Sequence, residues 1–476
     1  MPDHFLCVHA HFYQPPRGNP FADDDVPVEE GAEPYRNFNE KVTAECYAPN
    51  AALGNFGLMS FNLGATLARW LELNAPETYA QIVAGDREYT ARWGVGNALA
   101  QPAHHTILPL CRRRDKRLQV RWGQMSFEHR FGRPAEGMWL PEMAVDLETL
   151  EVLHECGIKF TVLGQSQFKG ANDGAGPYWV DLPSGDHLPV YSRDDWHSNQ
   201  LSFNIKAQGG AGRWAHNTLA PLRKTFPRFL LIGTDGETFG HHHAGEEHFL
   251  HWLLAYEAAS VGFEVTTLGR DLRDNPPQQT LEINERTAWS CWHGLNRWSM
   301  GCECTAGDTR WKPALRSAMD HLAARLDETY AAFMGELNLE PWHIREEYFR
   351  VRLGQLSETQ FLREFGQARL PAAKARALLD VLLAQFYAQR MYVSCTFYFE
   401  DLSRHEPRYG IANGLRAARL VARATGHDHT SAFRSDLELA TSNKNGTTGG
   451  QVLDEVMEWA RAAEPSDSKG AAEGGR

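Results

Sequence analysis

Long apolar runs are missing from this chain of 476 residues. No stretch of about 18 consecutive apolar residues occurs, so the sequence offers no ordinary membrane-spanning helix. The first residues, Met-Pro-Asp-His, have neither the basic segment nor the apolar core of a secretory signal. We therefore expect a cytoplasmic protein that does not associate with membranes.

An excess of positive charge is missing as well. Lys and Arg number 48 against 60 Asp and Glu, which gives a formal net charge of -12 at pH 7. Nucleic acids and anionic membrane surfaces would repel such a chain on average. We expect no nucleic-acid partner, and a neutral or small substrate fits the charge better. The oligomeric state does not follow from the sequence.

Cysteine is scarce, with eight in the whole chain. Half of them are scattered singly along the first 156 residues, which favours reduced thiols over a disulfide framework. The exception is "CWHGLNRWSMGCEC", in which Cys291, His293, Cys302 and Cys304 supply enough ligands for a tetrahedral zinc ion. Their spacing matches no common zinc finger, so thiols that merely pack beside tryptophan are the alternative.

The order of apolar patterns predicts an α/β protein. "FLCVHAHF", "GMWL" and "RFLLIGT" read as buried strands, while "NLGATLARWLELN" and "DLETLEVLHECG" read as helices, the second with an Asp cap and a terminal Gly. Strands that alternate with helices imply a parallel sheet, either open or closed into a barrel. After about residue 310 the pattern becomes helical, which is typical of a helical bundle.

Two of the strand-like runs end at a carboxylate, Glu142 in "GMWLPE" and Asp235 in "RFLLIGTD". In parallel α/β folds the carboxyl ends of strands carry the functional side chains, although a single acid there is often only a helix cap. A carboxylate pair suits glycoside cleavage, because one group attacks the sugar while the other protonates the leaving oxygen. Trp139 and Gln14 would suit the binding of a sugar.

Metal-dependent hydrolysis is the competing chemistry. His9 and His11 alternate on one predicted strand and so place both rings on one face. "HH" at 104–105 and "HHH" at 241–243 add further possible ligands around Asp235. The residue types alone leave both chemistries open.

The motifs "HAHFYQPPRGNPF", "GNALAQPAHHTILPL", "GMWLPE" and "DGETFGHHH", in this order, closely resemble the successive conserved regions of glycoside hydrolase family 57, whose members are retaining enzymes acting on α-glucans. Further along, "SCWHGLNRWSMGCECTAG" and "YVSCTFYFEDLSRHEP" resemble an uncharacterised domain fused to a subset of that family. Together the two resemblances cover nearly the whole chain.

The resemblance implies an incomplete (β/α)7 TIM-like barrel followed by a mostly helical domain. On this basis we expect a catalytic barrel over residues 1–275, a helical domain over 276–463 that completes the cleft, and a disordered tail over 464–476. In the family's first motif Gln-Pro often follows His-x-His directly, whereas here Phe12 and Tyr13 intervene before Gln14.

The same resemblance implies that Glu142 is the nucleophile and Asp235 the acid/base. It implies an α-glucan or malto-oligosaccharide substrate and neither a metal nor another cofactor. A retaining mechanism requires the two carboxyl groups to lie about 5 to 5.5 Å apart, and Asp235 to have a raised pKa. The residues expected to bind the sugar are His9, His11, Gln14, His105, Trp139, Glu237, Trp292 and Trp298.

Other functions stay open at this stage. Hydrolysis, 4-α-glucan transfer and branching share the first half-reaction, so the motifs do not separate them. A metal-dependent polysaccharide hydrolase, such as a deacetylase, uses a related irregular barrel. A non-catalytic glucan-binding protein is the third possibility, disfavoured because both acids are present.

Overall fold

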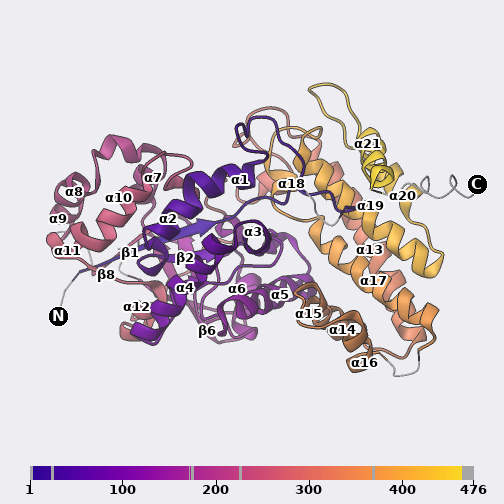
Figure 1. Cartoon of the computed structure of the whole chain (residues 1–476), viewed down its shortest axis with the longest axis horizontal. Helices are drawn as coiled ribbons and strands as arrows, with labels where there is room; N and C mark the ends of the chain where they lie inside the picture. Colours follow the sequence, from indigo (N-terminus) through magenta and orange to yellow (C-terminus); the bar gives the residue numbers. More distant parts are fainter. Residues whose placement is uncertain are drawn as a thin grey trace, which may run out of the picture. The chain divides into compact units, whose positions relative to one another are not determined.

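The computed structural model describes residues 4–22, 26–170, 172, 176–224, 228–366 and 370–463. The chain forms two compact units (Figure 1). The first contains Met1–Pro15, Val28–Arg297 and Arg352–Gln355, and the second contains Pro16–Pro27, Trp298–Val351 and Leu356–Arg476. The tail expected to be disordered, residues 464–476, lies outside the described residues.

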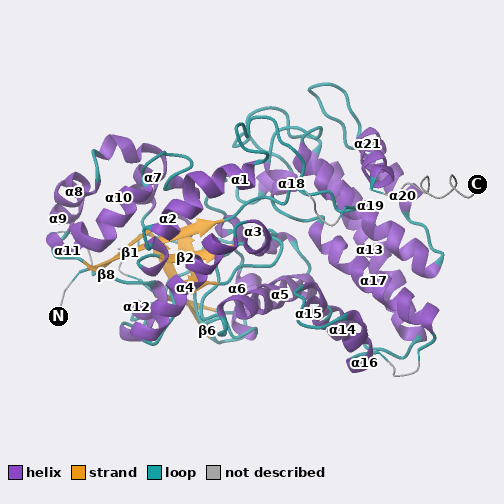
Figure 2. Cartoon of the chain, in the orientation of Figure 1, coloured by secondary structure: helices purple, strands orange, loops and turns teal. Residues whose placement is uncertain are grey.

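All the strands described belong to the first unit, where helices surround them (Figure 2). A five-stranded sheet has the order β3-β2-β1-β7, with β8 also paired to β1, and all these pairs are parallel. A second sheet has the order β4-β6-β5, in which β5 is antiparallel to β6. The strands are β1 (Phe5–Phe12), β2 (Ser60–Leu63), β3 (Ala98–Leu99), β4 (Thr161–Gly164), β5 (Tyr178–Asp181), β6 (His187–Arg193), β7 (Phe229–Asp235) and β8 (Glu264–Val265).

Backbone contacts join the two sheets into a ring. Residues 137–139 form parallel bridges to Ala100, just after β3, and to Phe160, just before β4. On the other side, Asp194 N, just after β6, donates to Leu231 O in β7 at 2.9 Å. Seven segments therefore follow one another around the ring, namely β1, β2, β3, residues 137–139, β4, β6 and β7. The predicted (β/α)7 barrel is confirmed.

Helices form most of the crossings between consecutive strands of the barrel, as parallel pairing favours, whereas the described chain between β4 and β6 contains β5 instead. Local signals fix their ends: the Asp146 carboxylate accepts from Thr149 N at 2.7 Å where α6 begins, and α4 ends at Gly94, whose φ of 73° suits glycine. The helices of this unit are α1 (Phe38–Val42), α2 (Ala48–Ala52), α3 (Ala65–Asn74), α4 (Pro76–Trp93), α5 (Arg113–Phe131), α6 (Leu147–Glu155), α7 (Asp195–Asn204), α8 (Ala211–Trp214), α9 (Ala220–Leu222), α10 (Glu247–Trp252), α11 (Ala258–Ser260) and α12 (Leu268–Asp274).

The strand residues of the barrel are buried on both faces, as expected for a parallel sheet covered by helices. Neighbouring residues, which point to opposite faces of a strand, are buried alike in one hydrophobic core: Leu6, Cys7 and Val8 in β1, and Leu230, Leu231 and Ile232 in β7. Beyond residue 275 the chain continues along this unit, because Thr280, Ile283 and Thr287 form bridges to residues of the first unit.

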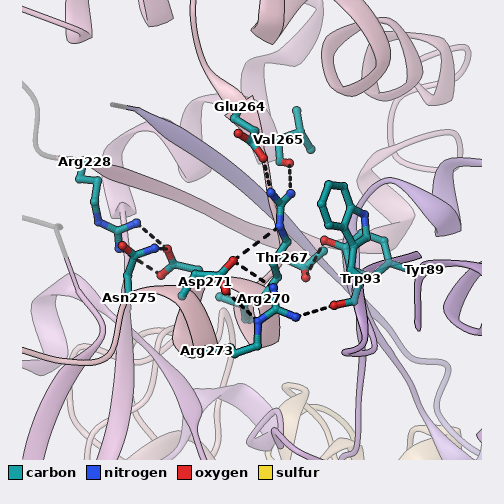
Figure 3. A network of polar contacts seen from close by, with 12 residues as sticks. Tyr89, Trp93, Arg228, Glu264, Val265, Thr267, Arg270, Asp271, Arg273 and Asn275 are labelled. Carbon is teal, nitrogen blue, oxygen red and sulfur yellow. Dashed lines mark hydrogen bonds and ion pairs between the residues drawn. The ribbon is translucent and has the colours of Figure 1, made fainter. Parts of the chain in front are cut away.

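A polar network holds the amino-terminal side of the barrel (Figure 3). Asp271 of α12 is buried and accepts hydrogen bonds from Arg228 at 2.5 and 3.2 Å, just before β7. Arg270, the neighbouring residue, pairs with Glu264 of β8, and its guanidinium lies 3.6 Å from the centroid of the Trp93 ring. The network therefore ties α12 to β7, β8 and the end of α4, at the edge of the barrel opposite the carboxyl ends of the strands.

The second unit is helical, in agreement with the pattern of the sequence. Its three long helices α13, α17 and α19 pack against one another (Figure 1). Within the described ranges, no helix combines the length and the apolar character that crossing a membrane requires. The remaining helices are α13 (Lys312–Glu336), α14 (Pro341–Glu347), α15 (Phe349–Arg352), α16 (Glu358–Glu364), α17 (Ala372–Arg390), α18 (Cys395–Tyr398), α19 (His405–Thr425), α20 (Thr430–Leu437) and α21 (Gly449–Ala462).

Candidate active site

The carboxyl ends of the barrel strands bring most of the predicted residues together. In the register of the sheet, His11 of β1 lies beside Asn62 of β2 on one side and beside Asp235 of β7 on the other. Trp139 ends the barrel segment 137–139, and Glu142 follows it. Phe160, just before β4, pairs with Gly137 of the same segment. The parallel order of the strands therefore explains why residues far apart in sequence share one edge.

A stack of aromatic rings forms one wall of this edge. The Trp139 ring stacks on His9 with centroids 4.6 Å apart and on His11 at 5.2 Å. His11 also stacks on His105 at 5.3 Å, and Tyr13 stacks on His105 at 3.7 Å. The wall thus contains four of the residues predicted to bind the sugar, together with Tyr13, one of the two residues that depart from the usual first motif.

The histidines of the wall are neutral near pH 7. Burial lowers the pKa of His9 to about 3 and that of His11 to about 4, and it also lowers the pKa of His105. Their ring nitrogens bind neighbours: His9 Nε2 lies 3.1 Å from Asn62 Oδ1, and His11 Nε2 lies 3.2 Å from His105 Nε2. These rings form a polar, uncharged network that can exchange hydrogen bonds with sugar hydroxyls.

Glu142 sits on a strained turn. It is the middle residue of the 3-10 turn Pro141–Met143, with φ 58° and ψ 18°, and Met143 follows with φ 48°. Two consecutive residues other than glycine in the left-handed region are costly, and such strain is concentrated at functional sites. His105 also has a positive φ, 53°.

The Glu142 carboxylate accepts two hydrogen bonds at Oε2, from Trp289 Nε1 at 2.9 Å and from Ser290 Oγ at 2.7 Å. The pKa of Glu142 is raised above its ordinary value, because burial raises it and these two donors and the charge of Arg297 offset that rise only in part. The two residues are also joined through their backbones, where Trp289 N donates to Glu142 O at 3.0 Å. Trp289 and Ser290 were not predicted from the sequence, because they lie in a loop without a periodic pattern.

Asp235 differs from Glu142 in its surroundings. Burial and the negative charge of Glu142 raise its pKa to about 7, and the charge of Arg193 opposes this rise. Arg193 ends β6, is itself buried, and its guanidinium lies 5.1 Å from the centroid of the Trp289 ring. Arg193 was also missed, although it ends an apolar strand in the same way as Asp235.

Glu237 lies just after Asp235, in the 3-10 turn Gly236–Thr238. Its Oε1 accepts from Tyr47 Oη at 2.6 Å and from Tyr13 N at 3.3 Å. Burial and the charge of Asp235 raise its pKa to about 8, so its side chain is mostly protonated near neutrality. Gln14 is buried and hydrogen-bonds Tyr47, which brings it into the same network.

The two remaining predicted residues, Trp292 and Trp298, have different surroundings. The Trp292 side chain is 88% exposed, and Trp289, three residues earlier, occupies the position beside Glu142. Trp298 belongs to the second unit, where it is fully buried with its ring 6.3 Å from that of Tyr398. Proximity in sequence to an aromatic-rich segment therefore did not identify which tryptophan reaches the carboxylates.

The other histidines of the sequence motifs have separate partners. His104 Nδ1 accepts from Gln119 Nε2 at 3.2 Å, His241 Nδ1 lies 2.6 Å from Glu45 Oε2, and His243 Nε2 lies 2.9 Å from Ser202 O. In the part of the chain that the structure describes, the group of three or more residues placed to hold a metal ion consists of Cys291, His293, Cys302 and Cys304. The carboxylate pair and its histidines do not form such a group.

Several solved structures share the fold. An exo-type maltose-forming amylase from Pyrococcus sp. ST04 superposes with a TM-score of 0.71 at 13% identity, over 97% of this chain and 91% of its own. A family 57 branching enzyme from Thermococcus kodakaraensis gives 0.60 at 15% identity, over 94% and 96%. An α-amylase from Thermotoga maritima gives 0.55 at 12% identity, over 95% and 99%.

Sequence comparison adds the family. No curated protein matches the chain. Residues 308–463 match the Domain of unknown function (DUF3536), and residues 55–284, which contain Trp139, Glu142 and Asp235, match Glycosyl hydrolase family 57. The barrel region of the chain is therefore identified as a Glycosyl hydrolase family 57 domain, a domain of glycoside hydrolases, and the DUF3536 domain follows it.

Proposed function

We propose that this enzyme is a retaining glycoside hydrolase or transglycosylase acting on α-1,4-glucan, with Glu142 as nucleophile and Asp235 as acid/base. The contrast between the two carboxyl groups carries the proposal. Glu142 accepts two hydrogen bonds that stabilise its charged form, whereas the pKa of Asp235 is raised to about 7 in part by the charge of Glu142. Near neutrality one carboxylate can attack while the other holds a proton, as a retaining mechanism requires.

In the first half-reaction Glu142 attacks the anomeric carbon and Asp235 gives its proton to the departing oxygen. The ester that forms removes the negative charge of Glu142. Because this charge is one cause of the raised pKa of Asp235, the pKa then falls and Asp235 becomes a better base. In the second half-reaction it takes a proton from water, or from a sugar hydroxyl, which attacks the intermediate.

The surroundings of the pair support a sugar substrate. Neutral imidazoles, the Asn62 amide and the Trp139 ring offer hydrogen bonds and an apolar face without a net charge. Both carboxyl side chains keep partial solvent exposure, which leaves them open to a substrate. The structurally similar amylases and branching enzyme point to α-glucan as the sugar.

The first experiment is product analysis with maltoheptaose and amylose, comparing the wild type with Glu142→Gln and Asp235→Asn. Turnover should fall by about 10³-fold or more in both variants. Glu155→Gln and Asp186→Asn, two exposed residues of the same unit, are the matched controls and should keep the wild-type rate. Shorter products would mean hydrolysis, longer ones transfer, and new α-1,6 linkages branching.

Azide identifies the role of each carboxylate. With a nitrophenyl α-maltoside, azide should restore turnover to Glu142→Ala and give the β-glycosyl azide, because azide then attacks in place of the nucleophile. It should give the α-glycosyl azide with Asp235→Ala, because the glycosyl-enzyme still forms there. The absence of any α-glucan turnover by the wild type, or release of acetate from an acetylated glycan, would contradict the proposal.

A further inference from the structure

One group of metal-ligating side chains stands outside the machinery described so far. It lies in a single stretch of 14 residues, Cys291–Cys304, which we name the cysteine loop. One ligand atom from each of Cys291, His293, Cys302 and Cys304 lies within 4.8 Å of all the others. The stretch is short and continuous, so the convergence of these atoms is a property of the conformation of the loop itself.

We propose that the cysteine loop binds one Zn²⁺ ion through three thiolates and the His293 imidazole. Three sulfur ligands and one nitrogen ligand form one of the usual sets of structural zinc sites. With bonds of about 2.3 Å, a tetrahedral ion holds its ligand atoms about 3.7 Å apart. The four atoms need to approach by at most about 1 Å to reach that geometry.

The ligand set selects zinc over other ions. Thiolates disfavour Mg²⁺ and Ca²⁺, which prefer oxygen, and iron–sulfur clusters commonly take four cysteines. Four protein ligands also fill the tetrahedral shell and leave no position for water or substrate, which marks a structural rather than a catalytic ion. None of the eight cysteines, all of which lie among the described residues, forms a disulfide, so these three are available as ligands.

Two glycines shape the loop between its ligands. Gly294 follows His293 with φ 71°, and a Cβ there would lie 2.7 Å from Arg286 O. Gly301 precedes Cys302 with φ 81°, and a Cβ there would lie 2.3 Å from Thr309 Oγ1. Both positions therefore require glycine. Gly294 and Gly301 fix the backbone conformation next to His293 and next to Cys302.

The position of the loop indicates what the bound ion does for the enzyme. This step rests on the proposed function. Cys291 directly follows Trp289 and Ser290, whose side chains donate to the Glu142 carboxylate. This stretch has little regular structure of its own, with only the short 3-10 turn Asn296–Trp298 and an isolated bridge between Ala288 and Cys291. An ion on Cys291 and His293 would therefore hold in place the segment that positions the nucleophile.

The test is the metal content of the full-length protein, purified without added metal or chelator. Elemental analysis should find about one zinc per chain. The double variant Cys302→Ser/Cys304→Ser should contain less than about a tenth of the wild-type zinc. Cys111→Ser, which changes a cysteine outside the loop, is the matched control and should keep the full content.

Cobalt supplies a readout for the case that the double variant does not fold. Wild-type protein stripped with a chelator and loaded with Co²⁺ should show thiolate charge-transfer bands and the intense visible bands of tetrahedral cobalt. A zinc content below about 0.1 per chain together with the absence of these bands, iron in place of zinc, or zinc retained by the double variant would overturn the proposal. None of these measurements uses a glucan, so failure of the zinc site and failure of the proposed activity are distinguishable.

Discussion

At the scale of single residues, the ionisation of Asp235 should set the upper pH limit of activity. Its pKa of about 7 predicts that kcat/KM falls as the pH rises through about 7, because the proton needed by the leaving oxygen is lost. Arg193 lowers this pKa, so Arg193→Met should move the basic limb upward by roughly half to one pH unit. Arg193→Lys keeps the charge and should leave the limb near its wild-type position; an unmoved limb in Arg193→Met would contradict the assignment of Asp235.

The lower limit should depend on Trp289. Its Nε1 donates to the Glu142 carboxylate and so stabilises the charged form of the nucleophile. Trp289→Phe removes this donor but keeps an aromatic ring for Arg193. The acid limb of the kcat/KM profile should therefore rise by about one pH unit, the effect of one hydrogen bond to a charged group. Trp292→Phe changes the exposed neighbour and should leave the pH profile unchanged. An equal shift of the acid limb in both variants would contradict the role of the Trp289 hydrogen bond.

Glu237 should make the stability of the protein depend on pH. Its pKa is raised from 4.5 to about 8, so between these values the folded state holds a proton that the unfolded state has released. Stability from this group is complete below about 4.5 and is lost as the pH rises through about 8, at about 1.4 kcal/mol per pH unit at most.

Glu237→Gln isolates that contribution. The amide is neutral at all pH values, and its oxygen can still accept from Tyr47 and Tyr13. Denaturant unfolding at pH 5, 6.5 and 8 should show a weaker loss of stability with pH in Glu237→Gln than in the wild type, while Glu155→Gln should behave as the wild type does. An identical pH dependence in Glu237→Gln and the wild type would show that Glu237 is not held protonated.

The sequence predicted the two carboxylates of the site, but not the side chains that hydrogen-bond to Glu142. Glu142 and Asp235 were found because each ends an apolar strand, and parallel strands bring such ends to one edge. Trp289 and Ser290 are separated from Glu142 by 147 and 148 residues and lie in a loop. No periodicity marks a loop contact of that kind, so their role required the structure.

At the scale of elements, periodicity predicted the buried strands and the long helices, since each depends on local pattern and caps. It did not predict β5, which pairs antiparallel with β6, nor that "GMWL" would join its neighbours only through isolated bridges. Pairing partners and ladder length depend on contacts far apart in the chain, which local pattern does not contain.

The element α12 offers a test of how the amino-terminal side of the barrel is held (Figure 3). Asp271→Asn leaves the Arg228 guanidinium without its charged partner inside the network. Breaking a buried pair of this kind should lower the free energy of unfolding by about 3 kcal/mol. Asp274→Asn, on the same helix but paired at the surface with Arg273, should cost less than about 1 kcal/mol. Equal losses in denaturant unfolding would mean that the network adds nothing beyond a surface pair.

At the scale of the whole molecule, the two units have separate hydrophobic cores. One core is built from the strands and helices of the barrel, and another lies among the helices of the second unit. Each core contains fully buried leucines, such as Leu230 in β7 and Leu382 in α17. A chain with two cores is expected to depart from two-state unfolding, because each core can be lost by itself.

Matched truncations can separate the two transitions. Leu230→Ala and Leu382→Ala remove the same atoms from fully buried positions, and each should destabilise its own unit by about 2 to 5 kcal/mol. In calorimetric scans each variant should lower the temperature of one transition and leave the other near its wild-type value. The site residues lie in the first unit. On heating, glucan turnover should therefore be lost at a lower temperature in Leu230→Ala than in Leu382→Ala. A single transition lowered equally by both substitutions would show instead that the two cores unfold as one cooperative structure.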